Sequence, residues 1–75
     1  MASLLDLTPR EIEILKSVLA GLTNKAIAVQ LYTTEKTVEF HLDNIYTKTG
    51  MRTRQLAGLW AMQQGMEIET RELPG

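Results

Sequence analysis

Residues 23–50 read TNKAIAVQLYTTEKTVEFHLDNIYTKTG, and this stretch decides the fold. A first helical segment begins at Thr23 or Asn24, either of which can cap a helix, and it continues for about two turns through Leu31. Ile27, Ala28 and Leu31 are predicted to form its inner face. The periodic pattern then breaks at Tyr32-Thr33-Thr34 before a second segment starts. A connection this short between two helices is typical of a helix-turn-helix.

The second segment predicts a helix over about residues 35–49, with Thr34 as its N-cap and Gly50 at its end. Fifteen residues at ~1.5 Å each give a rod about 22 Å long. A helical wheel places four residues together that should face the core, with His41 at the edge of that stripe: Val38, Leu42, Ile45 and Thr49. The opposite face is largely polar and carries Lys36, Glu39, Phe40, Asp43, Asn44 and Thr47.

In a helix-turn-helix this outer face lies in the DNA major groove. Asn44 and Lys36 suit contacts to bases or phosphates, Thr47 suits either, and Phe40 can meet a thymine methyl group. The competing interpretation is a plain solvated helix surface. Glu39 and Asp43 could accept from the amino group of cytosine, but they would also lie in the field of two phosphate strands.

Two more helices flank this pair. Thr8-Pro9-Arg10-Glu11 combines an N-cap, a proline at the first helical position and a capping box. The helix that follows is predicted to end at Gly21 and to face inward through Ile12, Leu15, Val18 and Leu19. A last helix is predicted from near Thr53 to near Gly65. The expected fold is therefore all-α, a four-helix bundle that contains the helix-turn-helix.

Length and charge fit one small domain. The chain has 75 residues, and we expect a single domain at 1–75 with its core over 7–66 and an acidic C-terminal tail over 67–75. The net charge is −1, but residues 7–66 carry seven basic and five acidic side chains, so this body is at +2. A mildly basic body is compatible with a nucleic-acid partner.

The composition argues against an enzyme. No cysteine is present, His41 is the only histidine, and no nucleophile-base pair or phosphate-cradling glycine loop is found. We expect neither a metal nor a cofactor, and we interpret His41 as structural, with a phosphate contact as the alternative. The sequence shows no signal peptide and no apolar run of the roughly 20 residues that would span a bilayer. We therefore expect a cytoplasmic protein with no membrane partner.

The last predicted helix is apolar around most of its circumference. Residues 56–62 read LAGLWAM, without a polar side chain, so one face should meet the core and another should remain exposed. We expect a self-association surface formed by Leu56, Leu59, Trp60 and Met62. Burial of the whole stretch within a monomer is the alternative.

Several spaced motifs occur together: Leu7-Thr8-Pro9-Arg10-Glu11, then residues 21–28 with GLTNKxIA, then residues 35–45 with EKTVxxHxxxI, and finally Lys48-x-Gly50 and Arg52-x-Arg54. Over about residues 7–65 the chain resembles the LuxR-type (FixJ/NarL/GerE-like) helix-turn-helix domain. The resemblance implies a DNA-binding transcription regulator whose third helix enters the major groove of double-stranded DNA. It also implies a homodimer formed through the fourth helix, and a sensing or receiver domain, or another transcription protein, as a further partner.

The resemblance also implies roles for individual residues. It places Glu39, Phe40 and Asp43 at base-reading positions, to which the helical wheel adds Asn44 and Thr47. It places six residues at or near the DNA backbone: Lys25, Lys36, Thr37, Lys48, Arg52 and Arg54. Members of the family usually have a basic residue where this chain has Glu39, and often another where it has Asp43. The alternative function is therefore a helix-turn-helix used as a protein-interaction module, with weak or no DNA binding.

Overall fold

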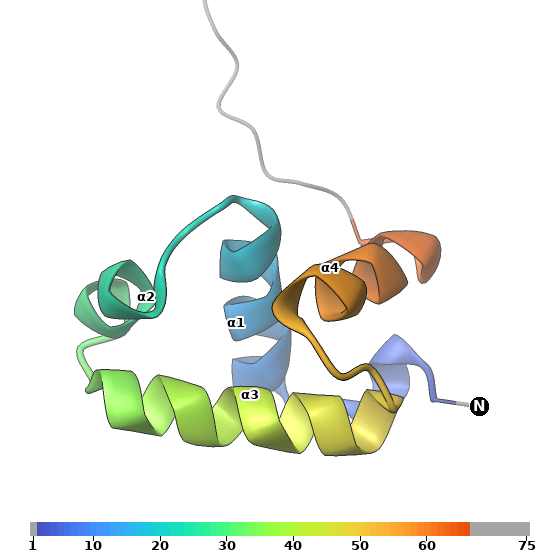
Figure 1. Cartoon of the computed structure of the whole chain (residues 1–75), viewed down its shortest axis with the longest axis horizontal. Coiled ribbons are helices and arrows are strands. Elements are labelled where there is room, and N and C mark those ends of the chain that lie inside the picture. Colours follow the sequence, from blue (N-terminus) through green and yellow to red (C-terminus); the bar gives the residue numbers. More distant parts are fainter. Residues whose placement is uncertain (1, 67–75) are drawn as a thin grey trace, which may run out of the picture.

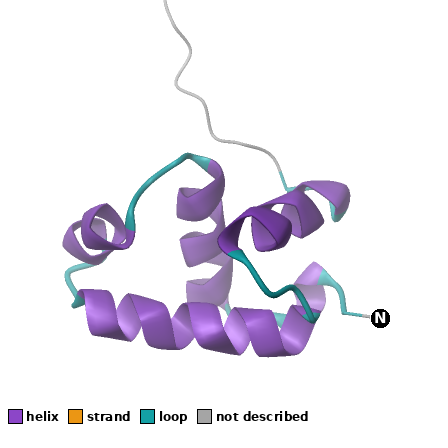
Figure 2. Ribbon diagram, in the orientation of Figure 1, coloured by secondary structure: helices purple, strands orange, loops and turns teal. Residues whose placement is uncertain are grey.

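A computed structural model describes residues 2–66, and within this part of the chain the structure is all-α (Figures 1 and 2). A short 3-10 turn, η1, precedes four α-helices: η1 Leu4–Asp6, α1 Pro9–Leu19, α2 Asn24–Gln30, α3 Glu35–Thr49 and α4 Arg54–Gln63. The predicted positions of the four helices and the short connection from α2 to α3 are confirmed. The expected acidic tail at 67–75 lies outside the described residues.

A threonine begins each of the four helices. The side chains of Thr8, Thr23, Thr34 and Thr53 each accept a hydrogen bond from a backbone N–H in the first turn of the helix that follows. The capping box predicted for α1 is confirmed, since Glu11 also accepts from the backbone N–H of Thr8. The turn η1 was not predicted from the sequence; Ser3 and Asp6 form a second capping box there.

Glycine ends three of the helices, as the pattern predicts. Gly21, Gly50 and Gly65 have φ angles of 85°, 75° and 95°, in the left-handed region that a side chain disfavours. The end of α2 is different, because Tyr32 adopts the same conformation with a φ of 56°. The sequence offered no signal for this turn.

Helix α1 stands upright against α3, which runs horizontally in Figure 1, while α2 and α4 flank α1. Helix α3 packs against α1, α2 and α4, and α1 also packs against α4. The residues at the centre of the fold are completely or almost completely buried: Ile14, Leu15, Ile27, Val38, Leu42, Ile45, Ala57 and Ala61. This arrangement holds one side of α3 in the core along its length.

The predicted inner face of α3 is confirmed. Val38, Leu42, Ile45 and Thr49 are buried, and His41 is half-buried beside them. In α1 the prediction was incomplete, because Ile14 was left out of the stripe and is fully buried. Ile12, Val18 and Leu19 are only partly buried. Since α1 packs against both α3 and α4, its buried arc is wider than the single stripe expected of a surface helix.

Within residues 2–66, the helices are all too short or too polar to cross a bilayer.

Candidate nucleic-acid interface

The outer face of α3 is open to solvent. Lys36, Glu39, Asp43 and Thr47 are exposed, Phe40 is 61% exposed, and Asn44 is half-buried. The Phe40 ring contacts the His41 ring edge to face, with centroids 5.7 Å apart. Among the described residues, the Glu39 and Asp43 carboxylates have no hydrogen bond or ion pair. The set of predicted base-reading residues therefore lies together on one accessible helix surface.

The N-terminal end of α3 is held in place by two threonines. Thr34 Oγ1 accepts from the backbone N–H of Thr37 at 3.1 Å, and the two hydroxyls are 3.0 Å apart. This arrangement leaves Thr37 half-buried, whereas Lys36 beside it is exposed. Lys25, in the first turn of α2, is exposed as well.

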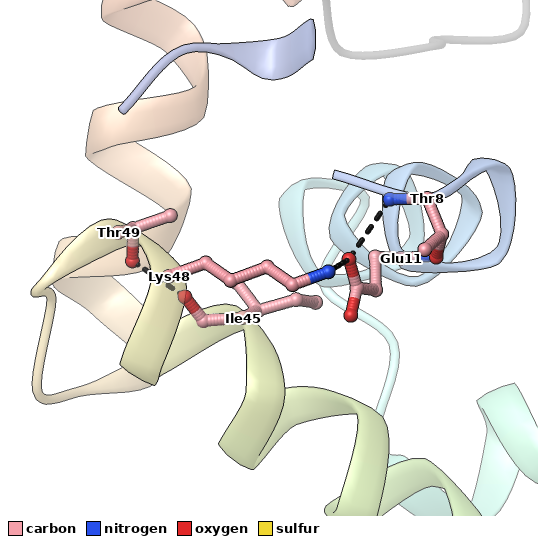
Figure 3. Close-up of polar contacts among 5 residues, drawn as sticks. All are labelled: Thr8, Glu11, Ile45, Lys48 and Thr49. Atoms are coloured by element: carbon pink, nitrogen blue, oxygen red, sulfur yellow. Dashed lines mark hydrogen bonds and ion pairs between the residues drawn. The ribbon is translucent and has the colours of Figure 1, made fainter. Parts of the chain in front are cut away.

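Lys48 has a different environment from the one expected of a phosphate-binding lysine. Its Nζ lies 2.8 Å from Oε1 of Glu11, which is buried at 3% exposure near the start of α1 (Figure 3). Burial by itself raises the pKa of the Glu11 carboxyl. The hydrogen bonds from Lys48 and Thr8, together with the charge of Lys48, outweigh that effect and leave the pKa of Glu11 below its ordinary value. The ammonium group of Lys48 thus fastens α3 to α1.

Arg54 is likewise engaged within the protein. From the first turn of α4, its guanidinium donates to the side-chain oxygen of Asn24 and to the backbone carbonyl of Leu22. The arginine therefore ties α4 to the loop that leads into α2. Arg52, two residues earlier, is exposed. Neither the contact of Lys48 nor that of Arg54 has a local sequence signal, because the partners lie 37 and 30 positions apart.

Three of the four residues expected at a self-association surface are accessible on α4. Leu56, Leu59 and Met62 are 46%, 52% and 49% exposed. Trp60 is only 8% exposed and belongs to the core, so it does not form part of the exposed surface of α4. The indole lies on the face of α4 that meets the rest of the molecule, a direction that the uninterrupted apolar run could not indicate.

Two of these three exposed residues border a shallow groove that α4 shares with α1. Leu59 and Met62 form one side of it, and Val18 and Leu19 form the other. Gly58 lies between them, where a β-carbon would be 3.4 Å from Cδ2 of Leu19. The lining is mostly apolar, which is the composition expected of a protein-binding surface.

Comparison with known proteins assigns the family. The family described as "Bacterial regulatory proteins, luxR family" matches residues 5–61, which include all four helices except the last two residues of α4. The match therefore covers the helix-turn-helix and the helices that support it.

Similar proteins occur in several bacteria. The chain is 46% identical over 65 residues to the transcriptional regulatory protein LnrK of Bacillus subtilis, covering 87% of this chain and 30% of that protein. It is 44% identical over 62 residues to the response regulator Rre1 of Synechocystis sp., covering 83% and 27%. It is 43% identical over 59 residues to the nitrate/nitrite response regulator protein NarL of Escherichia coli K12, covering 79% and 27%.

The chain thus spans less than a third of the length of these relatives. An all-α fold with a helix-turn-helix, an accessible third helix and a family match over most of the chain lead to one assignment. The chain belongs to the luxR family of bacterial regulatory proteins, a family of transcription regulators and not of enzymes, as its helix-turn-helix DNA-binding domain.

Proposed function

We propose that the domain binds double-stranded DNA by placing α3 in the major groove. The observation that carries this proposal is the division of α3 into a face buried in the core and a face exposed to solvent. A helix about 10–12 Å in diameter fits a groove about 12 Å wide. In that position the outward side chains of α3 meet base edges, while groups around its N-terminal end meet phosphates.

The roles within this surface follow from accessibility. Base-edge contacts are assigned to Glu39, Phe40, Asp43, Asn44 and Thr47. Backbone contacts are assigned first to the exposed cations Lys25, Lys36 and Arg52. Lys48 and Arg54 have partners within the protein, so their main role is to hold helices in position, and their charges attract the DNA backbone less than those of the exposed cations do. Thr37 supports the start of α3.

The regulator is proposed to act as a homodimer in the cytoplasm. Its dimer surface is assigned to Leu56, Leu59 and Met62, which helps explain why an apolar strip stays exposed. We further propose that residues 1–75 form one domain with its core at 7–66. Two relatives are named response regulators, which supports a sensing or receiver domain, or another transcription protein, as a partner in the whole protein.

A second candidate is the same fold used to bind proteins, with weak or no DNA binding. The exposed Glu39 and Asp43 carboxylates favour it, because each is repelled by phosphates wherever α3 enters the groove. A footprint on one DNA sequence at about 150 mM salt would reject this candidate, since screening at that ionic strength suppresses nonspecific attraction.

The Glu39→Gln variant tests the position of α3 directly. Removing one negative charge beside the phosphates should tighten binding to a duplex of about 20 base pairs by about fivefold, which corresponds to roughly 1 kcal/mol. Fluorescence anisotropy at two salt concentrations measures the change. The effect should shrink as salt rises, because screening weakens the repulsion that is removed.

The matched control is Ala20→Lys, which changes the net charge by the same amount. Ala20 is the exposed C-cap of α1, and that end of α1 points away from α3 (Figure 1). If both variants tightened binding equally, the gain would come from overall charge and α3 would not be the helix in the groove. A wild-type chain that did not bind the duplex at either salt concentration would also overturn the proposal.

A further inference from the structure

Tyr32 has an unusual conformation at the end of α2. Its φ angle is 56°, and it is the one residue other than glycine with a positive φ in the described part of the chain. Two backbone hydrogen bonds close the turn around it: Thr33 donates to the carbonyl of Ala28 at 2.9 Å, and Tyr32 donates to that of Val29 at 3.3 Å. This pair of bonds defines a Schellman helix end, whose left-handed position is usually a glycine.

The same chain builds this turn with glycine twice more. At the end of α1, Leu22 donates to Ser17 and Gly21 to Val18, both at 3.0 Å. The end of α4 repeats the pattern with Gly65 in the left-handed position. Tyr32 is therefore a bulky residue at a position where its own chain otherwise uses glycine, and its β-carbon crowds the backbone there.

The Tyr32 side chain makes no contact within the described part of the chain that would offset this backbone strain. Tyr32 is 97% exposed, and its hydroxyl has no hydrogen bond within residues 2–66. It does not pack against the core, in contrast to Tyr46 on α3, which is partly buried there. A strained backbone that supports a solvent-exposed aromatic ring suggests a role outside the folded domain.

The place of Tyr32 in the fold indicates the partner. It lies two residues before Thr34, the N-cap of α3, and close in sequence to the exposed Lys36. Phosphate strands border both sides of the groove, and groups that flank the N-terminal end of a recognition helix are the ones that contact them. A phenol can donate its O–H to a phosphate oxygen, and tyrosine is among the residues that do so in protein–DNA complexes.

We propose that Tyr32 is a DNA-backbone contact, whose hydroxyl donates a hydrogen bond to a phosphate at the edge of the groove entered by α3. This inference rests on the proposed function. The Tyr32 side chain is 97% exposed, so the residue that strains the turn is also free to reach a ligand. A protein partner for Tyr32 and the neighbouring Val29, which is 70% exposed, is the competing outcome.

Two substitutions of Tyr32 separate its effect on stability from its effect on DNA binding. Tyr32→Phe should weaken binding of the full chain to a duplex of about 20 base pairs by about 3- to 10-fold, the net worth of one hydrogen bond, without moving the Tm. Tyr32→Gly should weaken binding at least as much while raising the Tm by about 4–8 °C, because the turn is relieved. Gly21→Ala is the reverse control and should lower the Tm, since a β-carbon there meets no atom and only the backbone strain is added.

The salt dependence distinguishes this inference from the proposed function. Tyr32→Phe should leave the slope of log K against log salt unchanged, because a neutral hydroxyl releases no counterion, whereas Lys25→Ala should reduce it by about 1. Normal binding by Tyr32→Phe, with a reduced slope for Lys25→Ala, would overturn the tyrosine contact alone in favour of a protein partner. A wild-type chain that did not bind the duplex would overturn both.

Discussion

The Glu11 carboxylate shows how much one residue can determine at a helix start. Its Oε1 accepts from the backbone N–H of Thr8 at 2.9 Å and from Lys48 at 2.8 Å, so it completes the cap of α1 and binds α3 at once (Figure 3). The first contact was predicted from the Thr-Pro-Arg-Glu spacing. The second was not, because a pair separated by 37 positions leaves no periodic trace in the sequence.

The lowered pKa of Glu11 makes the stability of the domain depend on pH. A carboxyl whose pKa is lower in the folded than in the unfolded chain adds stability at pH values above its ordinary pKa. That contribution is lost as the pH falls through the lowered value. Glu11→Gln should reduce the free energy of unfolding near neutral pH by about 1–2 kcal/mol, because the Lys48 ammonium then faces a neutral amide oxygen in place of a carboxylate. The difference from wild type should disappear in strong acid.

Thermal denaturation from about pH 7 to about pH 2 measures this dependence. Glu13→Gln is the control, since Glu13 is exposed and its ion pair with Arg10 is long, at 3.9 Å. A Glu11→Gln variant with a constant deficit at every pH would contradict the explanation, because the loss would then not depend on the ionised carboxyl.

Features of a helix that depend on neighbouring residues are the ones that the sequence predicts best. The helix starts and the glycine ends each depend on a few neighbouring residues, and they lie close to where the sequence places them. Of the two caps that the sequence offered for α2, the structure has Thr23. Burial is predicted less well, because it depends on how many neighbours a helix has. Ile14 was missed since α1 packs on two helices, and Trp60 was assigned to the surface because residues 56–62 lack a polar side chain to mark the outer face.

The candidate site divides in the same way. The outer face of α3 follows from helical periodicity alone, and its accessibility is confirmed. The roles of Lys48 and Arg54 could not be obtained in this way, because a sequence does not show which cations are already paired across the fold. Of the five cations expected at the DNA backbone, the three without a partner among residues 2–66 are Lys25, Lys36 and Arg52.

Gly58 lies in the middle of α4, and replacing it tests whether α1 and α4 need a residue without a β-carbon there. A β-carbon at this position would be 3.4 Å from Cδ2 of Leu19, the end of a flexible side chain, and 4.0 Å from Cγ1 of Val18, an ordinary van der Waals distance. Alanine therefore fits without a clash, and it removes the penalty of glycine inside a helix. Gly58→Ala should raise the free energy of unfolding by about 0.5–1 kcal/mol, as measured by urea denaturation.

The matched comparison is Gly50→Ala, at the left-handed end of α3, where open space surrounds the added carbon but the φ of 75° is unfavourable. That substitution should destabilise the domain. A loss of stability in Gly58→Ala would mean that α1 and α4 are packed too closely at Gly58 to admit a methyl group.

The two proposed contact surfaces belong to different helices. Helix α3 presents Phe40 and its polar neighbours, while α4 presents Leu56, Leu59 and Met62, and both helices pack on α1. A two-fold pairing through α4 therefore leaves each α3 free. Such a dimer can place two α3 helices about 34 Å apart, one turn of DNA, on neighbouring half-sites.

Leu59→Glu tests this pairing. Leu59 is 52% exposed and borders the groove with Val18 and Leu19, so its side chain should be buried in the dimer. Losing that burial, about 1.5–3 kcal/mol, and burying a carboxylate instead should weaken dimerisation by at least about 10- to 100-fold in sedimentation velocity. Binding to two adjacent half-sites should fall with it, while the helical content by circular dichroism stays constant. Leu5→Glu, at a 96% exposed leucine of η1, makes the same exchange away from α4 and should change neither property. If Leu59→Glu sedimented as the wild type does, the dimer would have to form through another surface, and the exposure of α4 would need a different partner.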